Sequence, residues 1–329
     1  MTVCLFIIYV PVGAAWLKSP WGRHLLMWIF WIFVAAVVAY EVAHLAAELR
    51  IGAPTRGSCR AVVVVPTRGG GNLARFAGHV DYVVVDGAEA ARAAEAAGLR
   101  WVANRYVELG KSGALATALE VIDADLYVFV DDDAHPGPWL EALRGMCGRF
   151  ATAYRWVLGR LQNAFSLGGL DWMVWRRTRF LYGGAMTVPG ERRREAVVAL
   201  KRCPVDDMAL TKIAGDIAVL PLLVPMDPAP RTWEFFTRQA VAARLGNPLL
   251  WGVELVYYWA WVAAALLFPP LFLLHAARTA LRSRRALGRV DWAQVLLSPL
   301  ERPLEAFVFL ASAFRRCFKW GAREFCGGC

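Results

Sequence analysis

The chain has 329 residues, of which 58% are hydrophobic, and its mean hydropathy is +0.40. Both values are high for a water-soluble enzyme, so they indicate membrane segments. The formal net charge of +10 would suit nucleic acid, an anionic membrane surface or an anionic substrate. The basic residues flank apolar stretches or form short clusters, whereas nucleic-acid binders gather them in a stripe with exposed aromatic residues. We therefore expect no nucleic-acid partner.

Apolar segments lie at both ends of the chain. Near the N-terminus, residues 24–49 just reach the length that spans a bilayer. A cleaved signal peptide fits poorly, because no basic segment precedes the apolar run and the run starts too far into the chain. The preceding residues 1–16 are shorter and contain Pro11, so they predict a second, marginal span or an interfacial piece.

The strongest apolar stretch covers residues 249–277. Glu254 near its start is costly in lipid, so we expect it to face protein or the interface. Pro269 and Pro270 would kink or break the helix. A basic segment follows at 278–289, and a third, shorter apolar stretch follows at 303–314. The predicted plan is one span or two, a water-facing domain, and then two more spans.

The basic segment 278–289 makes the sidedness of this region ambiguous. If the central domain is cytoplasmic and residues 249–277 cross once, the segment falls outside, against the positive-inside tendency. A helix that breaks at the proline pair and returns to the same side would remove the conflict. The sequence does not decide between these arrangements.

The central residues 51–247 alternate between strand and helix patterns. Strands are predicted within 59–68, 80–87, 99–105 and 124–133, and helices within 89–99 and 111–122. This alternation indicates an α/β domain with a doubly wound, mostly parallel sheet. Ligands of such sheets bind beyond the carboxyl ends of the strands. Asp86 and the aspartates 131–133 follow predicted strands, so we expect them to be neighbours at that edge.

Three consecutive aspartates end the predicted strand 124–133. Asp131 and Asp133 could supply oxygen ligands to a hard divalent cation, with Asp132 pointing the other way. Mg²⁺ and Mn²⁺ favour a few protein carboxylates together with substrate phosphates and water. A solvated acidic turn is the alternative interpretation.

Several other short motifs have both a functional and a structural interpretation. Asp86 could accept hydrogen bonds from a nucleobase or ribose, or it could belong to an ordinary turn. Asp206 and Asp207 stand at a predicted helix start, where they could cap the helix or provide a general base. The pair Gly183 and Gly184 would let the backbone approach a ligand closely, or form a plain turn.

The cysteines predict no structural bonds. Seven cysteines at scattered spacing do not fit a secreted disulfide framework. We expect Cys59, Cys147 and Cys203 to be buried small residues. The terminal sequence CGGC has C-x-x-C spacing but lies in a Gly-rich tail without a second pair, so it predicts a free or casually oxidised tail.

Taken in order, these motifs resemble those of membrane-bound glycosyltransferases of glycosyltransferase family 2, which have the GT-A fold. The resemblance covers roughly residues 60–325 and is strongest to the ceramide glucosyltransferase-like branch. It implies Mg²⁺ or Mn²⁺ on Asp131 and Asp133, and a catalytic base at Asp207 with Asp206 beside it. The substrate contacts that it implies are Pro66, Arg68, Asp86, Lys111, Asp131, Gly183, Gly184 and, in the C-terminal tail, Trp320.

One family motif, Gln-x-x-Arg-Trp, is not intact in this chain. Arg238, Gln239 and Arg244 stand near its place without the tryptophan, and they could hold a diphosphate. The missing motif argues against a processive polysaccharide synthase, in which it holds the growing polymer. The segment between the first two strands is also shorter than is usual in the family.

The expected function is therefore inverting transfer of a sugar from a nucleoside-diphosphate sugar to a lipid hydroxyl. A polyprenyl phosphate acceptor needs no base, so the acidic pair at 206–207 favours a hydroxyl acceptor. A processive synthase, a polyprenyl-phosphate transferase and a non-enzymatic membrane scaffold are the alternatives. We expect a protein of the cell membrane with a cytoplasmic catalytic domain. The expected division is 1–50 (membrane), 51–247 (catalytic), 248–317 (membrane or interfacial) and 318–329 (tail).

Overall fold

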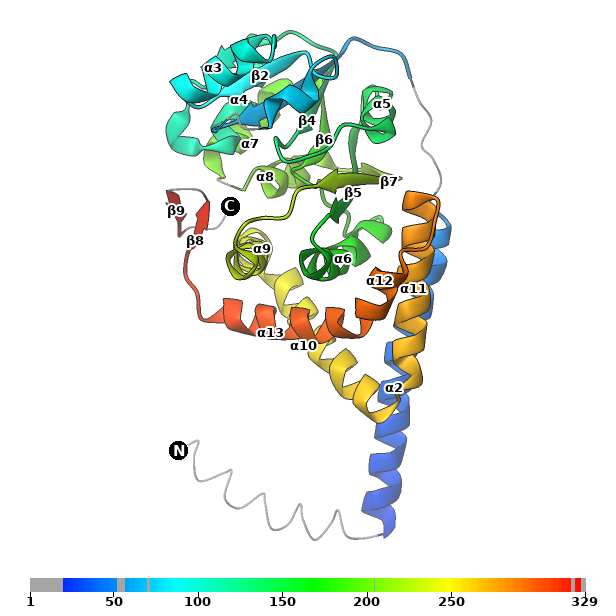
Figure 1. Cartoon of the computed structure of the whole chain (residues 1–329). Coiled ribbons are helices and arrows are strands. Elements are labelled where there is room, and N and C mark those ends of the chain that lie inside the picture. Colours follow the sequence, from blue (N-terminus) through cyan, green and yellow to red (C-terminus); the bar gives the residue numbers. More distant parts are fainter. Residues whose placement is uncertain (1–19, 52–56, 70–71, 204, 321–322, 327–329) are drawn as a thin grey trace, which may run out of the picture.

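A seven-stranded sheet forms the core of the central domain (Figure 1). The computed structural model describes residues 20–51, 57–69, 72–203, 205–320 and 323–326. The strand order is β3-β2-β1-β4-β6-β5-β7. Within this sheet β6 runs antiparallel to β4 and β5, whereas the other neighbouring pairs are parallel. The strands are β1 (Ala61–Thr67), β2 (Tyr82–Val85), β3 (Trp101–Ala103), β4 (Leu126–Val130), β5 (Phe150–Val157), β6 (Ala185–Pro189) and β7 (Ile217–Met226).

The mostly parallel α/β architecture predicted from the sequence is confirmed. Each of the four predicted strand segments contains a strand, and the two predicted helices contain α3 and α4. All five residues of β4 are buried, as continuous apolar strands are when helices cover both faces of a sheet. The helices of this domain are α3 (Ala88–Ala96), α4 (Lys111–Val121), α5 (Pro138–Arg144), α7 (Arg193–Arg202) and α8 (Asp206–Ala214), with short 3-10 helices at Leu73–Phe76, Val107–Leu109 and Gly190–Arg192.

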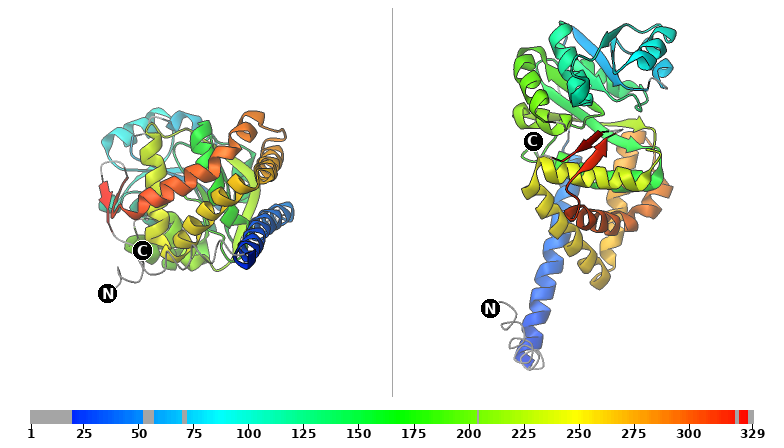
Figure 2. Two further views of the ribbon diagram at one scale, coloured as in Figure 1. Left: turned by 90° about the horizontal axis from the view of Figure 1, so that it is seen from below. Right: turned by 90° about the vertical axis from the view of Figure 1, so that its left-hand side faces the viewer.

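The remaining helices lie beside and below the sheet (Figures 1 and 2). They are α2 (Pro20–Leu49), α6 (Arg160–Val174), α9 (Thr232–Gly246), α10 (Pro248–Leu267), α11 (Pro270–Leu287), α12 (Trp292–Leu297) and α13 (Glu301–Ala313), with a 3-10 turn at Ser298–Leu300. A short hairpin of β8 (Phe318–Trp320) and β9 (Arg323–Phe325) follows. The helix α2 projects far beyond the rest of the molecule.

Two helices of the described chain are long and apolar enough to cross a membrane, Met27–Leu49 within α2 and Pro248–Leu267. Both expose large apolar side chains, including Trp28, Ile32 and Val256. The third expected stretch, 303–314, lies in α13, which has 13 residues and is too short to span. The expected segment 1–16 lies outside the described residues.

The strongest predicted stretch, 249–277, is not one continuous helix. Helix α10 ends at Leu267, and α11 begins at Pro270. The break lies at the proline pair because proline removes a backbone N–H and its ring clashes with the preceding turn. Helix α11 then returns alongside α2 towards the central sheet (Figure 1). The basic segment 278–289 therefore lies on the same side of the helix break as the central domain.

A cluster of buried charges joins α2, α6, α11 and α13. The guanidinium of Arg278 lies 2.5 Å from Glu41 Oε2, and that of Arg282 lies 2.8 Å from Glu48 and 2.6 Å from Asp171. Each of these five side chains is almost fully buried. Burial of an unpaired charge is costly, so the pairing explains why glutamates occur in the apolar helix α2. These contacts attach α2 to the rest of the fold.

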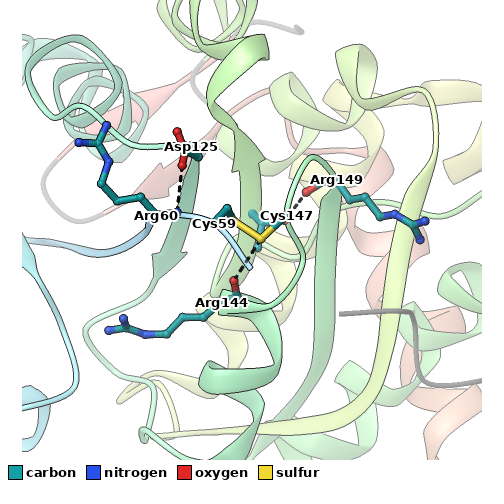
Figure 3. The surroundings of a disulfide bond; sticks show 7 residues. Cys59, Arg60, Asp125, Arg144, Cys147 and Arg149 are labelled. Atoms are coloured by element: carbon teal, nitrogen blue, oxygen red, sulfur yellow. Dashed lines mark hydrogen bonds between the residues drawn. A yellow bond between two sulfur atoms is a disulfide. The ribbon is translucent and has the colours of Figure 1, made fainter. Parts of the chain in front are cut away.

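The expectation that the cysteines form no disulfides is wrong, although Cys203 is buried, as expected. Cys59, just before β1, forms a disulfide with Cys147 in the loop between α5 and β5 (Figure 3). Cys317 and Cys326 form a second disulfide across the β8–β9 hairpin. The first pair is separated by 88 residues, so only the folded chain brings the two cysteines together. Within the CGGC tail, Cys326 pairs outside the motif, and Cys329 lies outside the described residues.

Candidate active site

A cavity of about 520 Å³ opens at the carboxyl ends of the parallel strands. Its size suits a small-molecule site, for which about 300–1,000 Å³ is typical. Twelve of the residues singled out in the sequence line it: Pro66, Arg68, Asp86, Lys111, Asp131, Asp133, Gly183, Gly184, Asp206, Asp207, Arg238 and Gln239.

The topology of the sheet explains this convergence. Strands β1, β2 and β4 are parallel neighbours, so the residues that follow them, Arg68, Asp86 and Asp131, meet at one edge. Strand β6 is antiparallel to β4, so the pair Gly183 and Gly184, which precedes β6, reaches the same edge. The backbone N–H of Asp131 donates to the carbonyl of Gly184 at 3.2 Å.

Lys111 lies at the centre of the site. Gly110, whose φ is +60°, lets the chain turn into α4, and Lys111 is the first residue of that helix. The Nζ atom of Lys111 lies 2.5 Å from Asp131 Oδ1 and 3.0 Å from Asp206 Oδ2, and it donates to the carbonyl of Gly183 at 2.8 Å. Burial lowers the pKa of Lys111, but the two carboxylates outweigh it and raise the pKa above its usual value. The lysine is therefore a permanent cation that holds two acidic segments together.

The three aspartates have different surroundings. Asp131 pairs with Lys111, and Asp132 accepts a hydrogen bond from Thr67 Oγ1 at 2.6 Å. The Oδ1 atom of Asp133 is buried and has no hydrogen-bond partner among the described residues. Burial, and then the charge of Asp131, raise the pKa of Asp133 to about 7. Asp133 is therefore a carboxylate that lacks a compensating cation.

This donor set fits a divalent cation that shares its ligands with a substrate. Among the described residues, no group of three or more His, Cys, Asp or Glu side chains is arranged to hold a metal alone. Mg²⁺ is commonly held by one or two carboxylates plus substrate phosphates and water. Asp133, with its buried unpartnered oxygen, and Asp131 are the two carboxylates that would hold the cation.

The acidic pair at the start of α8 does not act as a helix N-cap. The N-cap position is occupied by Val205, and Asp206 and Asp207 are the first two residues of the helix. Asp206 is fully buried against Lys111. Asp207 lines the cavity, and its Oδ1 accepts the backbone N–H of Met208 at 2.7 Å. Burial, and then the charge of Asp206, raise the pKa of Asp207 to about 7, a value that suits a general base near neutral pH.

Gly183 leaves room for these contacts. A Cβ atom at this position would lie 3.0 Å from both Asp206 Oδ2 and Lys111 Nζ. Any side chain would therefore press on the ion pair that joins α4 to α8. The absence of a side chain here preserves the geometry of the acidic pair.

Two of the predicted contacts lie elsewhere. Arg244 does not line the cavity, because its guanidinium donates to the backbone carbonyls of Ala313 and Arg315 and so ties α9 to the end of α13. Trp320 is in β8, and the placement of its side chain lies outside the described part of the structure.

The cavity is also lined by residues that the sequence did not indicate, among them Arg155 on β5, Tyr182 before β6, and Asp227 after β7. The guanidinium of Arg155 lies 5.2 Å from the centre of the Tyr182 ring, and its charge opposes the raised pKa of Asp133. Asp227 accepts a hydrogen bond from His135. No motif marked Arg155 or Asp227, because strands β5 and β7 were not predicted.

No family model matches the chain, and no curated protein sequence matches it. Among solved structures, a mannosyltransferase from Pyrobaculum calidifontis in complex with GDP-Man and Mn²⁺ has a TM-score of 0.48 and 16% identity, over 85% of this chain and 97% of that chain. Glucosyl-3-phosphoglycerate synthase from Mycobacterium tuberculosis, in complex with Mn²⁺, UDP and glucosyl-3-phosphoglycerate, has a TM-score of 0.37 and 19% identity, over 61% of this chain and 81% of that chain. Mannosyl-3-phosphoglycerate synthase from Rubrobacter xylanophilus has a TM-score of 0.36 and 16% identity, over 59% of this chain and 75% of that chain. TM-scores below 0.5 do not decide an activity, which must be argued from the cavity.

Proposed function

We propose that the protein is a membrane glycosyltransferase that moves a sugar from a nucleoside-diphosphate sugar to a lipid hydroxyl with inversion. The observation that carries this proposal is that one cavity gathers a carboxylate pair for a cation, Asp131 and Asp133, and a separate acidic residue, Asp207, whose pKa is near neutral. These are the groups that departure of a diphosphate and deprotonation of a hydroxyl require.

Different cavity residues would bind the cation, contact the donor and accept the proton. A bound Mg²⁺ or Mn²⁺ would neutralise the charge that develops on the departing diphosphate. Arg238 and Gln239 line the same cavity and could contact the diphosphate oxygens, while Asp86 could contact the ribose or base. Asp207 would accept the proton of the attacking hydroxyl, on the opposite face of the sugar from the diphosphate.

The apolar helices support a lipid acceptor. The exposed apolar side chains of α2 and α10 would face acyl chains, and the break between α10 and α11 keeps the C-terminal region on one side of the bilayer. We place the catalytic domain on the cytoplasmic side of the cell membrane.

Turnover of sugar nucleotides by the full chain in detergent tests the proposal. A panel of sugar nucleotides would be assayed with Mn²⁺, Mg²⁺ or EDTA, with and without extracted lipid. We expect metal-dependent release of nucleotide that lipid stimulates and a product carrying one sugar. A polymeric product would identify a processive synthase instead. If no donor is turned over with lipid and metal present, the transferase proposal fails.

Replacing Asp133 by Asn is expected to lower metal-dependent turnover at least about 100-fold, because the cation stabilises the departing charge by several kcal/mol. Mn²⁺-dependent binding of the nucleoside diphosphate, measured by calorimetry, should weaken in the same variant. The matched control is Asp123→Asn, whose side chain is 78% exposed and pairs with Arg60 on the surface. Equal metal dependence in wild type and Asp133→Asn would contradict this role.

The pH profile of turnover should reflect Asp207. A general base acts in its deprotonated form, and burial raises the pKa of Asp207 to about 7. We therefore expect kcat/KM to rise about tenfold per pH unit below pH 7 and to level off above it. The profile is measured with one sugar-nucleotide donor, and the metal ion is kept at a fixed excess over that donor. An acid limb centred near pH 4, the ordinary range of aspartate, would rule out this assignment.

A further inference from the structure

A second cavity of about 300 Å³ adjoins the first. Its walls come from α6, α9, α10 and α13, with further residues from β5, α8 and the segment before β6. They are mainly apolar, with Phe165, Trp251 and Phe309 among them, although Arg155, Arg177 and Arg179 also line the cavity. Asp207 and Gln239 line both cavities, so the proposed base stands where the two meet. A ligand in the second cavity can therefore present a hydroxyl to Asp207 while its apolar part lies between the helices.

Two buried carboxyl groups line the second cavity but not the first. They are Glu254 on α10 and Glu305 on α13, which are 6% and 0% exposed. Glu305 Oε2 accepts a hydrogen bond from Arg302 at 2.7 Å, but its buried Oε1 has no hydrogen-bond partner among the described residues. Within that part of the chain, Glu254 has no hydrogen bond or ion pair.

Unsatisfied buried carboxyl oxygens are costly, and native proteins contain few of them. A neighbouring carboxylate shows that the fold can provide hydrogen-bond partners for buried acidic groups. Glu301, on the same helix as Glu305, forms a hydrogen bond of 2.8 Å with His275. Glu305 lines the cavity, so its unpartnered oxygen lies beside the space that a ligand would occupy. Burial raises the pKa of Glu305 to about 7, which favours the uncharged carboxyl, and this group can exchange hydrogen bonds with a polar group of a ligand.

We propose that the second cavity holds the acceptor and that Glu254 and Glu305 select acceptors with a second hydrogen-bond donor, such as a hydroxyl, amide or ammonium group. The reacting hydroxyl would lie at Asp207, and the second donor would lie at the carboxyl groups. This inference rests on the proposed function and names the chemical class of its acceptor. A single-chain amino alcohol has the required chemistry.

Photo-crosslinking tests the inference without turnover. The full-length protein in detergent would be labelled with 12-carbon probes that carry a mid-chain diazirine and end in a 2-amino alcohol or a plain alcohol. Labelled peptides would be mapped by mass spectrometry. We expect the amino alcohol to label peptides containing Phe165, Trp251 or Phe309 at concentrations at least about tenfold lower than the plain alcohol.

Two variants and one control assign the selectivity to the carboxyl groups. Glu254→Leu removes a side chain that has no ion pair to break, and Glu305→Gln keeps the shape of the second carboxyl. Each should reduce the advantage of the amino alcohol to below about threefold. Val253→Leu changes a neighbouring residue of α10 that is 50% exposed and does not line the cavity, so the preference should persist.

The outcomes separate this inference from the proposed function. Equal labelling by amino alcohol and plain alcohol in the wild type, or an unchanged preference in both glutamate variants, overturns the selectivity. If sugar nucleotides are turned over but the probes show no preference, the transferase stands and this inference fails. If the preference is found but no sugar nucleotide is turned over, the cavity is a selective amphiphile site, and its assignment as an acceptor site is wrong.

Discussion

Replacing Asp207 by Asn is expected to lower kcat by about 10²- to 10⁴-fold, which is the usual contribution of a general base. Asn is close to Asp in size, so the cavity keeps its shape, but its amide cannot accept the proton of the attacking hydroxyl. In the proposed assignment Asp207 contacts the acceptor and not the nucleoside diphosphate, so the Kd of the nucleoside diphosphate should change little. Single-turnover kinetics and calorimetry with the same protein measure the two quantities.

The variant Asp206→Asn should differ from Asp207→Asn in its effect on stability. Asp206 is fully buried and pairs with Lys111, so Asp206→Asn should lower stability as well as activity. Asp207→Asn should keep the melting temperature of the wild type, as should the surface control Asp123→Asn. If Asp207→Asn retains more than about a tenth of the wild-type kcat, a different residue or no residue accepts the proton.

Removing the disulfide Cys59–Cys147 should lower the free energy of unfolding by about 4.5 kcal/mol. In the chain-entropy model, the loss grows with the length of the closed loop, and this bond closes a loop whose ends are 88 residues apart. The double variant Cys59→Ser, Cys147→Ser would be compared with the wild type by denaturant unfolding at constant detergent. The bond joins the start of β1 to the loop before β5, so its loss affects the sheet directly.

The second disulfide is the matched control for this prediction. Cys317 and Cys326 are nine residues apart, so the same relation gives about 2.5 kcal/mol for the variant Cys317→Ser, Cys326→Ser. The two double variants should therefore differ by about 2 kcal/mol. Equal losses, or a loss below about 1 kcal/mol for Cys59–Cys147, would show that loop closure does not control the stabilisation.

Local sequence patterns predicted the N-terminal half of the sheet well. Residues 61–67 and 126–130 are continuous apolar runs, and such runs form buried parallel strands in almost any α/β context. The strands β5, β6 and β7 were not predicted. Strand β6 is antiparallel and follows a glycine pair that also fits a turn. Whether these residues form a strand therefore depends on their pairing with β4, which is distant in sequence.

The candidate site residues also fall into those whose positions local sequence predicted and those whose positions it did not. Asp86 and Asp131 were placed correctly at one edge of the sheet, because both directly follow parallel strands. The carboxyl ends of parallel strands lie at the same edge, so strand direction alone predicts that the two residues are neighbours. Arg155 and Asp227 were missed because their strands were missed. Arg244 was misplaced because a motif fragment does not show which way a helical side chain points, and in the structure it binds the end of α13.

By itself, the sequence determined the parallel sheet, the acidic triplet after β4, the acidic pair at α8 and the break at Pro269 and Pro270. Each of these follows from local properties: the period of apolar residues, the direction of a strand and the missing N–H of proline. Only the tertiary structure decided the partners across the chain. Lys111 joins segments about 20 and about 95 residues away, and Cys59 meets Cys147, because contacts between distant segments depend on how the whole sheet is assembled.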